Sequence, residues 1–551
     1  CDIQSGEGSR GNPIQLWISC KVQTRVSVTV PRTGMNIGNY VLQPGKVQIL
    51  PVPQTLMNTI TGITDNGVYI KADDPITVTV YVSYKWTGEA YRVIPAEVLG
   101  KRYFTLNMYQ DKTERERPAQ VLIVGTKDNT IVSFSPKTLT EDGVPAGGSK
   151  NYKLMRGQTL LIKAKIQPGK DLDWTTDLTG SKITATSPVA VFSGHTKGAF
   201  PRFQATMLGI PANFMRNMMM DAMWPVEFLG KEYFSAPIMY TDRPRANFDL
   251  DSWGDLIRIV ATEDNTLIYT KTCGGPNPDA TYQPRYPALK AGQEYRIDSQ
   301  EWPALYRASK PVIVGQYGKA WRLNQVQGTG KTNDEQNPSR NGQGMMYVLT
   351  PEEQWSSYTT FYSPESIDNF VMVTFYTADR GKLIFDGAPI NAKFGSYIKQ
   401  VSGTDKSYIV APIAAGSHTL EGAKFTAYVY GNWDKSKDGF AYGYPTGVNF
   451  AQSCPDTVVI SADIDCGLVK GLAQIKPDTS TCSSIYTVEM DALKSNNFKL
   501  ELDPGFESGM LKAPFTATVL DMTKDAHIRI VAVSRSGKEA SIELDYIAEN
   551  V

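Results

Sequence analysis

One strand opening occurs three times in this chain, at positions more than a hundred residues apart. It reads Ala-x-x-Pro, then Val or Ile, any residue and Val, beginning at Ala72, Ala185 and Ala308. Proline suits the first residue of a β-strand, where its missing N–H costs least. The apolar run behind each proline is typical of a strand buried on both faces. A chain with this recurrence is constrained to fold as repeated β units. The prolines to which we assign this structural role are Pro75, Pro188 and Pro311.

Two β-rich runs are joined by Thr-x-Asp-Asn-Thr at two places in the chain. The turns fall at Asp128-Asn129 and at Asp264-Asn265. Asp and Asn side chains can bond the local backbone and tolerate the left-handed conformation that a tight turn needs. We interpret each of these turns as the tip of a β-hairpin.

A second turn signal reads apolar-x-x-Gly and is followed by a strand at four places. Glycine suits this position because a turn into a strand often needs a positive φ. The four glycines, which we expect to be structural, are Gly45, Gly157, Gly292 and Gly416.

A linker signal separates the repeated segments. The stretches "PAEVLGKRYF" from Pro95 and "PVEFLGKEYF" from Pro225 match at seven of ten positions. Together the signals predict an all-β fold of four tandem units, which we expect to be sandwich-like because each is long, although four units also permit a propeller-like ring. Alternating strands near the end predict an immunoglobulin-like sandwich. The predicted boundaries are 1–93 for a truncated first unit with an N-terminal tether, 94–222, 223–348 and 349–450 for the other units, and 451–551 for the C-terminal domain.

Five motifs resemble those of the IgGFc-binding protein N-terminal domain family. In chain order they are "DLTGSKITATSPVAVFSGH", "PVEFLGKEYF", "VATEDNT", "LKAGQEY" and "YGYP". The resemblance covers roughly residues 15–450 and implies an extracellular β-rich region. It implies no catalytic residues. The family name comes from an animal member, so Fc binding is not transferred to this chain. The cysteine at position 1 and the trailing sandwich look more like the bacterial members.

The cysteines indicate an oxidising compartment. Cys1 is a candidate for the lipid-carrying cysteine of a processed bacterial lipoprotein, with Asp2 to Gly11 as a polar tether. The alternatives are a secreted chain in which Cys1 pairs with Cys20, or an artificial boundary. The remaining candidates for disulfides are Cys20, Cys273, Cys454, Cys466 and Cys482.

The charge balance excludes one class of partner. Lys and Arg number 56, as do Asp and Glu, and no basic cluster interrupts the chain, which argues against nucleic-acid binding. No apolar run reaches the roughly 18 residues needed to span a bilayer. We therefore expect membrane association only through a lipid on Cys1.

Motifs that resemble catalytic sites are weak. Ser193 and His195 lie in "FSGH", but Ser193 is not in G-x-S-x-G, and a histidine at the end of a strand is the simpler interpretation. "GTGKT" at 328–332 lacks the first glycine of a phosphate loop, because Gln325 stands there. It lies in the long polar run 322–344, which we interpret as a solvated, assembly or ligand loop.

Three further features leave alternatives open. Six methionines between Met207 and Met223 indicate a packed insertion or a partner-binding surface. The Asp-Asn turns are the candidates for calcium, although they lack a carboxylate-rich loop, and we expect no metal site and no cofactor. Exposed aromatic residues could stack on sugars. The aromatic candidates are Trp253, Trp302, Trp321 and Trp355.

These observations favour a non-enzymatic cell-surface or secreted adhesion protein. Stiff β modules would display loops that bind a glycan, a glycoprotein or another protein. The alternative is a structural subunit of an extracellular filament or surface assembly, in which edge strands join neighbours, including further copies of the chain. A glycan-processing enzyme is the third hypothesis, and it would need two carboxylates facing a cleft, for which the sequence singles out no pair.

Overall fold

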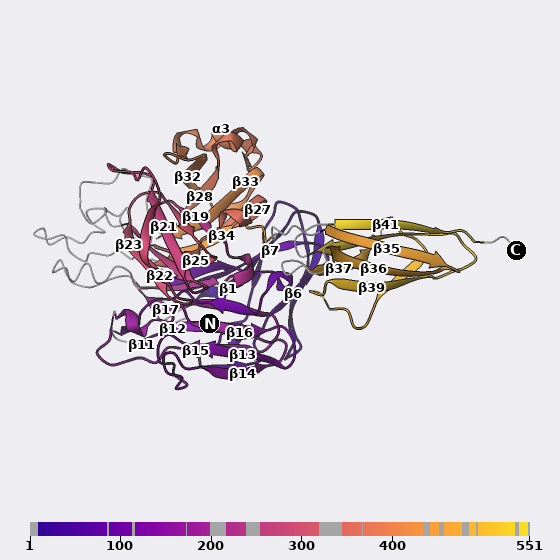
Figure 1. The fold of residues 1–551 in the computed structure, drawn as a ribbon, viewed down its shortest axis with the longest axis horizontal. Helices are drawn as coiled ribbons and strands as arrows, with labels where there is room; N and C mark the ends of the chain where they lie inside the picture. The colour runs from indigo at the N-terminus through magenta and orange to yellow at the C-terminus, as the bar shows by residue number, and fades with distance from the viewer. Residues whose placement is uncertain are drawn as a thin grey trace, which may run out of the picture. The chain divides into compact units, whose positions relative to one another are not determined.

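The computed structural model shows a chain built almost entirely of β-strands, confirming the predicted all-β class. It describes residues 9–84, 87–112, 116–171, 173–198, 216–238, 254–318, 344–365, 367–432, 441–450, 457–476, 484–491, 494–507, 509–534 and 539–548. Two compact units contain these residues, Cys1–Val448 and Asn449–Val551. Figure 1 shows their strands with the labels used below.

The N-terminal strands form two sheets with one shared core. These strands are β1 (Ser9–Cys20), β2 (Thr24–Val30), β3 (Met35–Leu42), β4 (Gln48–Pro51), β6 (Tyr69–Ala72), β7 (Ile76–Tyr84) and β8 (Thr87–Arg92), with the 3₁₀ turn η1 (Gln54–Leu56). The inner sheet has the order β4-β1-β7-β8 and the outer sheet the order β3-β2-β6. Leu16 and Ile18 of β1 pack with Val26 and Val28 of β2 between the sheets. We call this set of strands pair 1.

The next strands have the same order in two sheets, which we call pair 2. They are β9 (Arg102–Phe104), β12 (Ala119–Gly125), β13 (Thr130–Ser135), β14 (Lys150–Leu154), β15 (Thr159–Lys163), β16 (Lys182–Ala185), β17 (Val189–Gly198) and β18 (Asn217–Ala222), with η3 (Trp174–Thr176) and the short hairpin β10 (Asp111–Lys112) and β11 (Glu116–Arg117). The inner sheet is β18-β17-β12-β15, extended by β5 (Gly62–Thr64). The outer sheet is β14-β13-β16-β9, so β9 adds a fourth strand that pair 1 lacks.

Pair 3 repeats the arrangement of pair 2. Its strands are β19 (Glu232–Ser235), β20 (Asp255–Ala261), β21 (Thr266–Thr272), β22 (Gln283–Leu289), β23 (Glu294–Gln300), β24 (Ala304–Ala308), β25 (Val312–Gly318) and β26 (Met345–Val348). The inner sheet is β26-β25-β20-β23, and the outer sheet is β22-β21-β24-β19.

In pair 4 one long strand belongs to both layers. The elements are β27 (Ser356–Ser363), β28 (Asp368–Tyr376), η8 (Thr377–Lys382), β29 (Ile384–Phe385), β30 (Ala388–Pro389), α3 (Ile390–Phe394), η9 (Gly395–Tyr397), β31 (Lys399–Gln400), β32 (Lys406–Ile413), β33 (Gly416–Asn432) and β34 (Ala441–Thr446). The first part of β33 pairs with β27 and β29, and its second part pairs with β28 and β34. Four tandem units with the predicted boundaries remain our proposal, which this recurring strand order supports.

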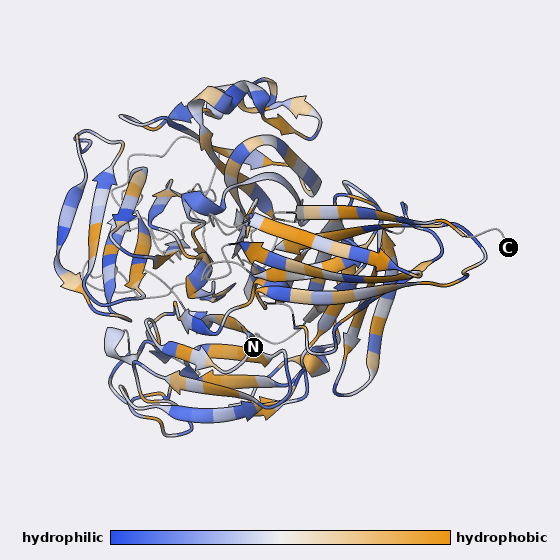
Figure 2. Ribbon diagram, turned by 45° about the vertical axis from the view of Figure 1, so that its right-hand side comes forward, coloured by the Kyte–Doolittle hydropathy of each residue, from blue (hydrophilic) through white to orange (hydrophobic). Residues whose placement is uncertain are grey.

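The unit Asn449–Val551 is a separate two-sheet sandwich. Its strands are β35 (Thr457–Asp465), β36 (Leu468–Lys476), β37 (Ile485–Met490), β38 (Phe498–Leu502), β39 (Lys512–Val519), β40 (Ala526–Ser534) and β41 (Glu539–Tyr546). Burial alternates along β39 and β40 with the period of two expected for strands with one face in a core. In Figure 2 hydrophobic and hydrophilic residues also alternate along strands of this unit. The sheet orders are β35-β36-β39-β38 and β37-β40-β41. With the strands lettered in chain order, these are the orders A-B-E-D and C-F-G of a constant-type immunoglobulin domain.

A tyrosine attaches the linker strand to its sheet in pairs 2 and 3. β9 and β19 each precede their pair in the chain and follow a 3₁₀ turn, η2 (Ala96–Val98) or η4 (Val226–Phe228). The buried hydroxyl of Tyr233 accepts the Gly230 N–H at 3.1 Å and donates to the Val312 carbonyl at 2.5 Å. Tyr103 makes the equivalent contacts in pair 2. The matching linker sequences thus have a shared structural cause.

We predict that Tyr233→Phe lowers the free energy of unfolding by about 1–3 kcal/mol, because a buried N–H and a buried carbonyl both lose their partner. Urea denaturation measures this change. Tyr286→Phe is the control, because the Tyr286 side chain is 75% exposed. Equal losses in the two variants would contradict the assigned role of the Tyr233 hydroxyl.

Candidate functional site

Four buried edge strands meet at the centre of residues 1–448. β8 contacts β18 and β34, and β26 contacts the same two strands, so the four strands form a closed cycle. Every residue of β18, β26 and β34 is buried. Each of the four strands is the last strand of its inner sheet, so one side of each backbone has no strand neighbour there. Buried backbone groups need hydrogen-bond partners, and these must come from side chains. We call this centre the hub.

Asn217 connects all four segments of the hub. Its side-chain oxygen accepts hydrogen bonds from the Gly88 N–H at 2.7 Å and from the Thr87 hydroxyl at 3.1 Å. Its side-chain NH₂ donates to the Gly344 carbonyl at 2.7 Å and to the Ala441 carbonyl at 2.8 Å. One fully buried amide on β18 therefore contacts β8, β34 and the residue before β26.

Two buried carboxylates hold further backbone groups of the hub. Glu89 on β8 accepts the Gly443 N–H of β34 at 2.8 Å. Asp221 on β18 accepts the Val348 N–H of β26 at 2.7 Å. Both side chains are at most 1% exposed. Each carboxylate therefore binds the backbone of a neighbouring strand.

Burial dominates the protonation of these two acids. It raises the pKa of Asp221 to about 8, against the smaller opposing effect of its backbone hydrogen bonds. Burial also raises the pKa of Glu89 well above its ordinary value, and the charge of Asp221 adds to the increase. Perturbed carboxyl pairs occur at catalytic sites as well as in structural networks. Here both carboxyls accept hydrogen bonds from strand N–H groups, which favours a structural role.

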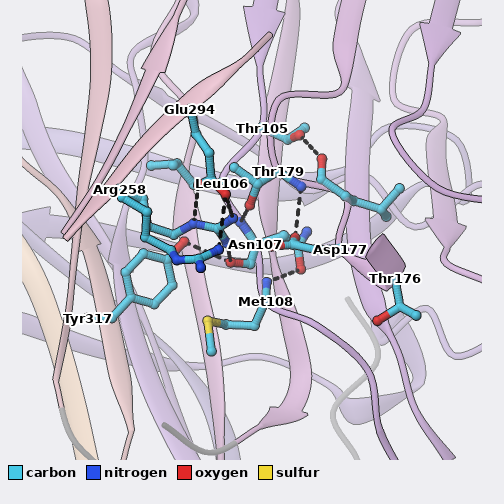
Figure 3. Close-up of polar contacts among 12 residues, drawn as sticks. Thr105, Leu106, Asn107, Met108, Thr176, Asp177, Thr179, Arg258, Glu294 and Tyr317 are labelled. Atoms are coloured by element: carbon cyan, nitrogen blue, oxygen red, sulfur yellow. Dashed lines mark hydrogen bonds and ion pairs between the residues drawn. The ribbon is translucent and has the colours of Figure 1, made fainter. Parts of the chain in front are cut away.

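A second buried polar cluster lies between pair 2 and pair 3 (Figure 3). Arg258 on β20 is 1% exposed and forms a bidentate contact with Glu294, through Nε at 2.6 Å and Nη2 at 2.8 Å. Its Nη1 donates to the Asp177 carboxylate at 2.5 Å and to the Asn107 carbonyl at 2.6 Å. The Tyr317 hydroxyl donates to the same carbonyl at 3.0 Å. The guanidinium of pair 3 thus holds a segment of pair 2.

The electrostatics of this cluster are those of a satisfied ion network. Burial by itself would lower the pKa of Arg258, but the charges of Asp177 and Glu294 outweigh it and hold this pKa above its ordinary value. Burial would raise the pKa of Glu294, yet Arg258 outweighs that effect and lowers it. The Trp174 ring lies 4.8 Å from the guanidinium carbon of Arg258 and 3.9 Å from that of Arg296. The arrangement braces two sheet pairs through charge-assisted hydrogen bonds.

Ser193 and His195 are both buried on β17, and they do not form a nucleophile–base pair. The Ser193 hydroxyl donates to the Leu106 carbonyl and accepts from the Asn107 side chain, both at 2.9 Å. His195 Nδ1 accepts the Lys197 N–H at 3.1 Å. Burial lowers the pKa of His195 to about 4. These contacts give His195 a structural place, but the residue lies inside β17, between β12 and β18, and not at the end of the strand as expected.

The Asp-Asn turns adopt the expected backbone but not the expected hairpin. Asn129 and Asn265 have φ values of 57° and 58°, in the left-handed region. However, the flanking strands β12 and β13 belong to different sheets, as do β20 and β21, so each turn crosses from the inner to the outer sheet. The hairpin prediction was wrong, because a tight turn can join two strands of the same sheet or two strands of different sheets. Asp128 accepts the Arg156 N–H and Asp264 accepts the Ala291 N–H, both at 2.9 Å.

Those contacts tie the Asp-Asn turns to the glycine turns. Gly157 and Gly292 have φ values of 79° and 76°, and a Cβ on Gly292 would lie 2.6 Å from the Gly180 carbonyl oxygen of pair 2. Gly45, at φ 70°, precedes β4, as Gly157 precedes β15 and Gly292 precedes β23. Gly416 instead begins β33, and Gly403, which precedes β32, occupies the corresponding place. The four-residue glycine signal is too short to separate these two positions.

The predicted prolines lie next to strand starts. Pro75 immediately precedes β7, Pro188 precedes β17 and Pro311 precedes β25. All three of these strands lie inside their inner sheets, flanked on both sides. The repeated strand opening therefore marks the strand that pairs with the hub strand.

The expected disulfides of Cys20 and Cys273 are not formed among the described cysteines. Both thiols are free and buried. Burial, with a smaller contribution from Asp74, raises the pKa of Cys20, and burial raises that of Cys273. Their places in separate apolar cores explain why an even cysteine count is a poor guide here. Cys466 lies exposed between β35 and β36, and Cys1, Cys454 and Cys482 lie outside the described residues.

The remaining candidates are distributed across the chain. Trp302 is 42% exposed and Trp355 is buried, and Met218, Met219, Met220 and Met223 pack in the interior. Within the described residues, His, Cys, Asp and Glu form no group of three suited to a metal ion, the Asp-Asn turns included. The part of the chain that the structure describes has no helix long and apolar enough to cross a membrane. The segment 328–332, Met207, Trp253 and Trp321 lie outside that part.

An open groove of about 460 Å³ lies on the outer sheet of pair 1. The exposed side chains of Arg25, Lys71 and Asp73 line it, and Ser27, Asn39 and Val41 complete the surface. A recurring backbone hydrogen bond identifies the matching positions in the other pairs. In pair 1 the Asp73 N–H donates to the Arg25 carbonyl. The equivalent bonds run from Thr186 to Ile131 in pair 2 and from Ser309 to Leu267 in pair 3. The matches of Arg25, Lys71 and Asp73 are all uncharged in pair 2, whereas pair 3 keeps one charge, because Arg307 matches Lys71.

Packed antiparallel sheets, held together in part by buried polar and charged side chains, define a multi-sandwich protein whose accessible features are sheet faces, edges and loops. A family model described as IgGFc binding protein matches residues 89–431, more than half of the chain. The chain belongs to this family, as its motifs indicated.

The chain is also similar to one curated protein over part of its length and aligns weakly with one solved structure. Human IgGFc-binding protein is 27% identical over 188 residues, which are 33% of this chain and 3% of that protein. The chain therefore spans a small part of that relative. The solved native conformation of E. coli alpha-2-macroglobulin aligns with 98% of this chain and 46% of that chain, at 8% identity and a TM-score of 0.14. That score carries no structural argument.

Sequence reasoning missed the buried polar residues Glu89, Asn217, Asp221 and Arg258. One signal was visible: Asp221 interrupts the otherwise apolar run "NMMMDAM", and a charged residue in a buried strand is rare unless it has a specific partner. The partners in the hub are more than a hundred residues away in the chain, as with Asp221 and Val348, and Arg258 lies 81 residues from Asp177.

We predict that Asp221 makes the stability of this unit decrease as pH rises. Its folded pKa of about 8 exceeds the unfolded value of about 4, so its contribution is complete below about pH 4 and is lost as pH rises through 8. Thermal denaturation across this range should show a shallower pH dependence for Asp221→Asn, by at most about 1.4 kcal/mol per pH unit. The exposed Asp298→Asn is the control, and an unchanged slope in the Asp221 variant would contradict the assignment.

We also predict that Arg258→Ala destabilises the protein by about 3–5 kcal/mol, because the buried Asp177 loses its charge partner and the partly exposed Glu294 keeps only Arg296. Chemical denaturation measures this loss. The matched control is Arg307→Ala, which removes the exposed ion pair with Glu232 and should cost less than about 1 kcal/mol. Similar losses in both variants would show that the Arg258 network contributes no more than a surface pair.

Proposed function

We propose that this protein is a non-enzymatic extracellular binding protein that engages a protein or glycoprotein through the outer face of pair 1. The observation that carries the proposal is the groove with Arg25, Lys71 and Asp73, whose aligned positions in pairs 2 and 3 mostly lack charge. Open grooves with a few charged groups can fix the orientation of a polar partner. The family is named for binding an antibody fragment, which supports a protein partner as the ligand class.

Two parts of the chain would support this function by presenting the protein at a cell surface. The sandwich Asn449–Val551 is proposed as an immunoglobulin-like module on the basis of its strand order. A lipid on Cys1 is proposed as the attachment to a cell surface. Both assignments concern presentation of the binding face, and the groove residues can be tested without either of them.

We predict that Arg25→Ala combined with Lys71→Ala weakens partner binding about tenfold or more, because two positive charges leave the groove. Immobilised human IgG Fc, a mucin-type glycoprotein and its deglycosylated form serve as probes in biolayer interferometry. Wild-type binding to at least one probe should weaken as salt increases.

The control for this experiment is the double variant Lys153→Ala and Lys182→Ala. It removes two exposed charges of the same sign from the outer sheet of pair 2 and should bind as the wild type does. Equal affinity of the groove variant and the wild type, or failure of all three probes to bind, would contradict the proposal.

A further inference from the structure

The outer sheet of pair 1 has one strand fewer than its counterparts. In pairs 2 and 3 the fourth strand is the linker strand, β9 beside β16 and β19 beside β24, and both pairings are antiparallel. In pair 4 β27 takes the same place beside β33. Among the described strands, β6 pairs with β2 alone. The edge of β6 that faces away from β2 is therefore the position that a linker strand occupies in every other pair.

The backbone of β6 is oriented to receive a strand. Asp73 N–H donates to the Arg25 carbonyl on β2, and alternate residues of an antiparallel strand face opposite neighbours, so the N–H groups of Ala72 and Ile70 point away from β2. At the matching positions, Ala185 N–H donates to the Lys101 carbonyl at 2.8 Å and Ala308 N–H donates to the Lys231 carbonyl at 2.9 Å. The edge of β6 thus presents the same two donors without these partners.

Side chains beside this edge are less buried than their counterparts. Val189 and Val312, whose carbonyls accept the hydroxyls of Tyr103 and Tyr233, are at most 1% exposed. The corresponding residue in pair 1 is Ile76, which directly follows Pro75 and is partly exposed. The Ile76 carbonyl therefore occupies the position of the carbonyls that accept the tyrosine hydroxyls in pairs 2 and 3.

The surface of η2, the 3₁₀ turn that follows pair 1, also lacks a linker strand among the described residues. Pro225 and Pro351 are buried, because each packs on the glycine that precedes a linker strand. A Cβ added to Gly100 would lie 2.6 Å from the Pro225 Cβ. A Cβ added to Gly230 would lie 2.4 Å from the Pro351 Cβ. The equivalent Pro95 is exposed.

An acidic residue completes this surface. Glu227 accepts a hydrogen bond from Arg102 at 3.3 Å, and Glu353 accepts the Lys231 N–H at 3.1 Å, so each turn holds the linker strand before it. Glu97 is the equivalent residue of η2, and its side chain is exposed. Pro95 and Glu97 therefore form the receiving surface for a linker strand on β6.

We propose that the β6 edge together with Pro95 and Glu97 binds an extended strand of another polypeptide, antiparallel to β6, with the pattern Gly-Lys-x-Tyr-Phe. The glycine would pack under Pro95, the lysine N–H would reach Glu97, and the tyrosine hydroxyl would donate to the Ile76 carbonyl. This is strand addition, in which backbone pairing supplies affinity and a side-chain pocket supplies specificity.

The two copies of this pattern among residues 1–551, at 100–104 and 230–234, already pair within pairs 2 and 3. Neither copy is therefore available to the β6 edge of its own chain, and the proposal names a second polypeptide as the source of the strand. The proposal concerns an edge of the sheet and is independent of the groove on its face.

A peptide with the sequence of residues 225–235, PVEFLGKEYFS, is the direct probe. Fluorescence anisotropy of the labelled peptide should show saturable binding to the full chain. The same peptide with Tyr233→Ser and Phe234→Ser should bind at least about tenfold more weakly. Absence of saturable binding by the unaltered peptide would overturn the proposal.

The receiving edge is tested with Ala72→Pro, which removes one outward N–H while leaving the hydrogen bonds to β2 in place. Binding should weaken at least about tenfold. Lys153→Pro is the matched control, because Lys153 lies on β14, the edge strand of the outer sheet of pair 2, and its N–H also points outward. Equal effects of the two prolines would overturn the proposal.

Two further measurements keep the proposal testable if Ala72→Pro does not fold. Glu97→Ala lies outside the sheet and should also weaken peptide binding. Hydrogen exchange of the wild-type chain should slow at Ile70 and Ala72 when the peptide binds, while Lys153 stays unchanged. Peptide binding without protection at Ile70 and Ala72 would show that the peptide occupies another surface.

Discussion

The structure of residues 1–448 depends on how four buried strand edges obtain hydrogen-bond partners. A strand edge in water is satisfied by solvent, but the edges of β8, β18, β26 and β34 face one another inside the protein. Asn217, Glu89 and Asp221 supply the acceptors and donors that neighbouring strands would otherwise provide. Apolar contacts alone could not hold these four strands together, because each unsatisfied buried backbone group would cost about 1–3 kcal/mol.

The same constraint explains why buried ionisable groups are no evidence of catalysis in this protein. The carboxylates of the hub bind strand N–H groups, and Arg258 binds two carboxylates and a carbonyl. A catalytic acid or base needs a partner that can be exchanged for substrate, whereas these groups already have protein partners that define strand positions. The family match to a binding type of protein and the geometry therefore agree.

Function is consequently expected at the faces and edges of sheets. The linker strands show how the molecule uses such an edge internally, with a tyrosine hydroxyl anchored on a carbonyl and a glutamate holding the strand from above. Pair 1 retains the receiving parts of this device, and its outer face has a charged groove whose aligned positions in pairs 2 and 3 mostly lack charge. The two proposed partner surfaces, the edge of β6 and the groove, therefore lie on the same pair of sheets.

The sequence by itself determined the strands, the turns and the family, because these follow from local backbone preferences and short motifs. Asn129 and Asn265 adopt the left-handed conformation that their type favours, and the prolines begin the strands predicted for them. Only the tertiary structure decided which sheet each strand joins: the Asp-Asn turns cross between sheets, Gly403 takes the place expected for Gly416, and Cys20 and Cys273 remain apart in separate cores. It also decided the hub, since Asp221 and Val348 meet only after the sheets have packed. Such long-range pairings depend on the summed geometry of many strands, which no short stretch of sequence contains.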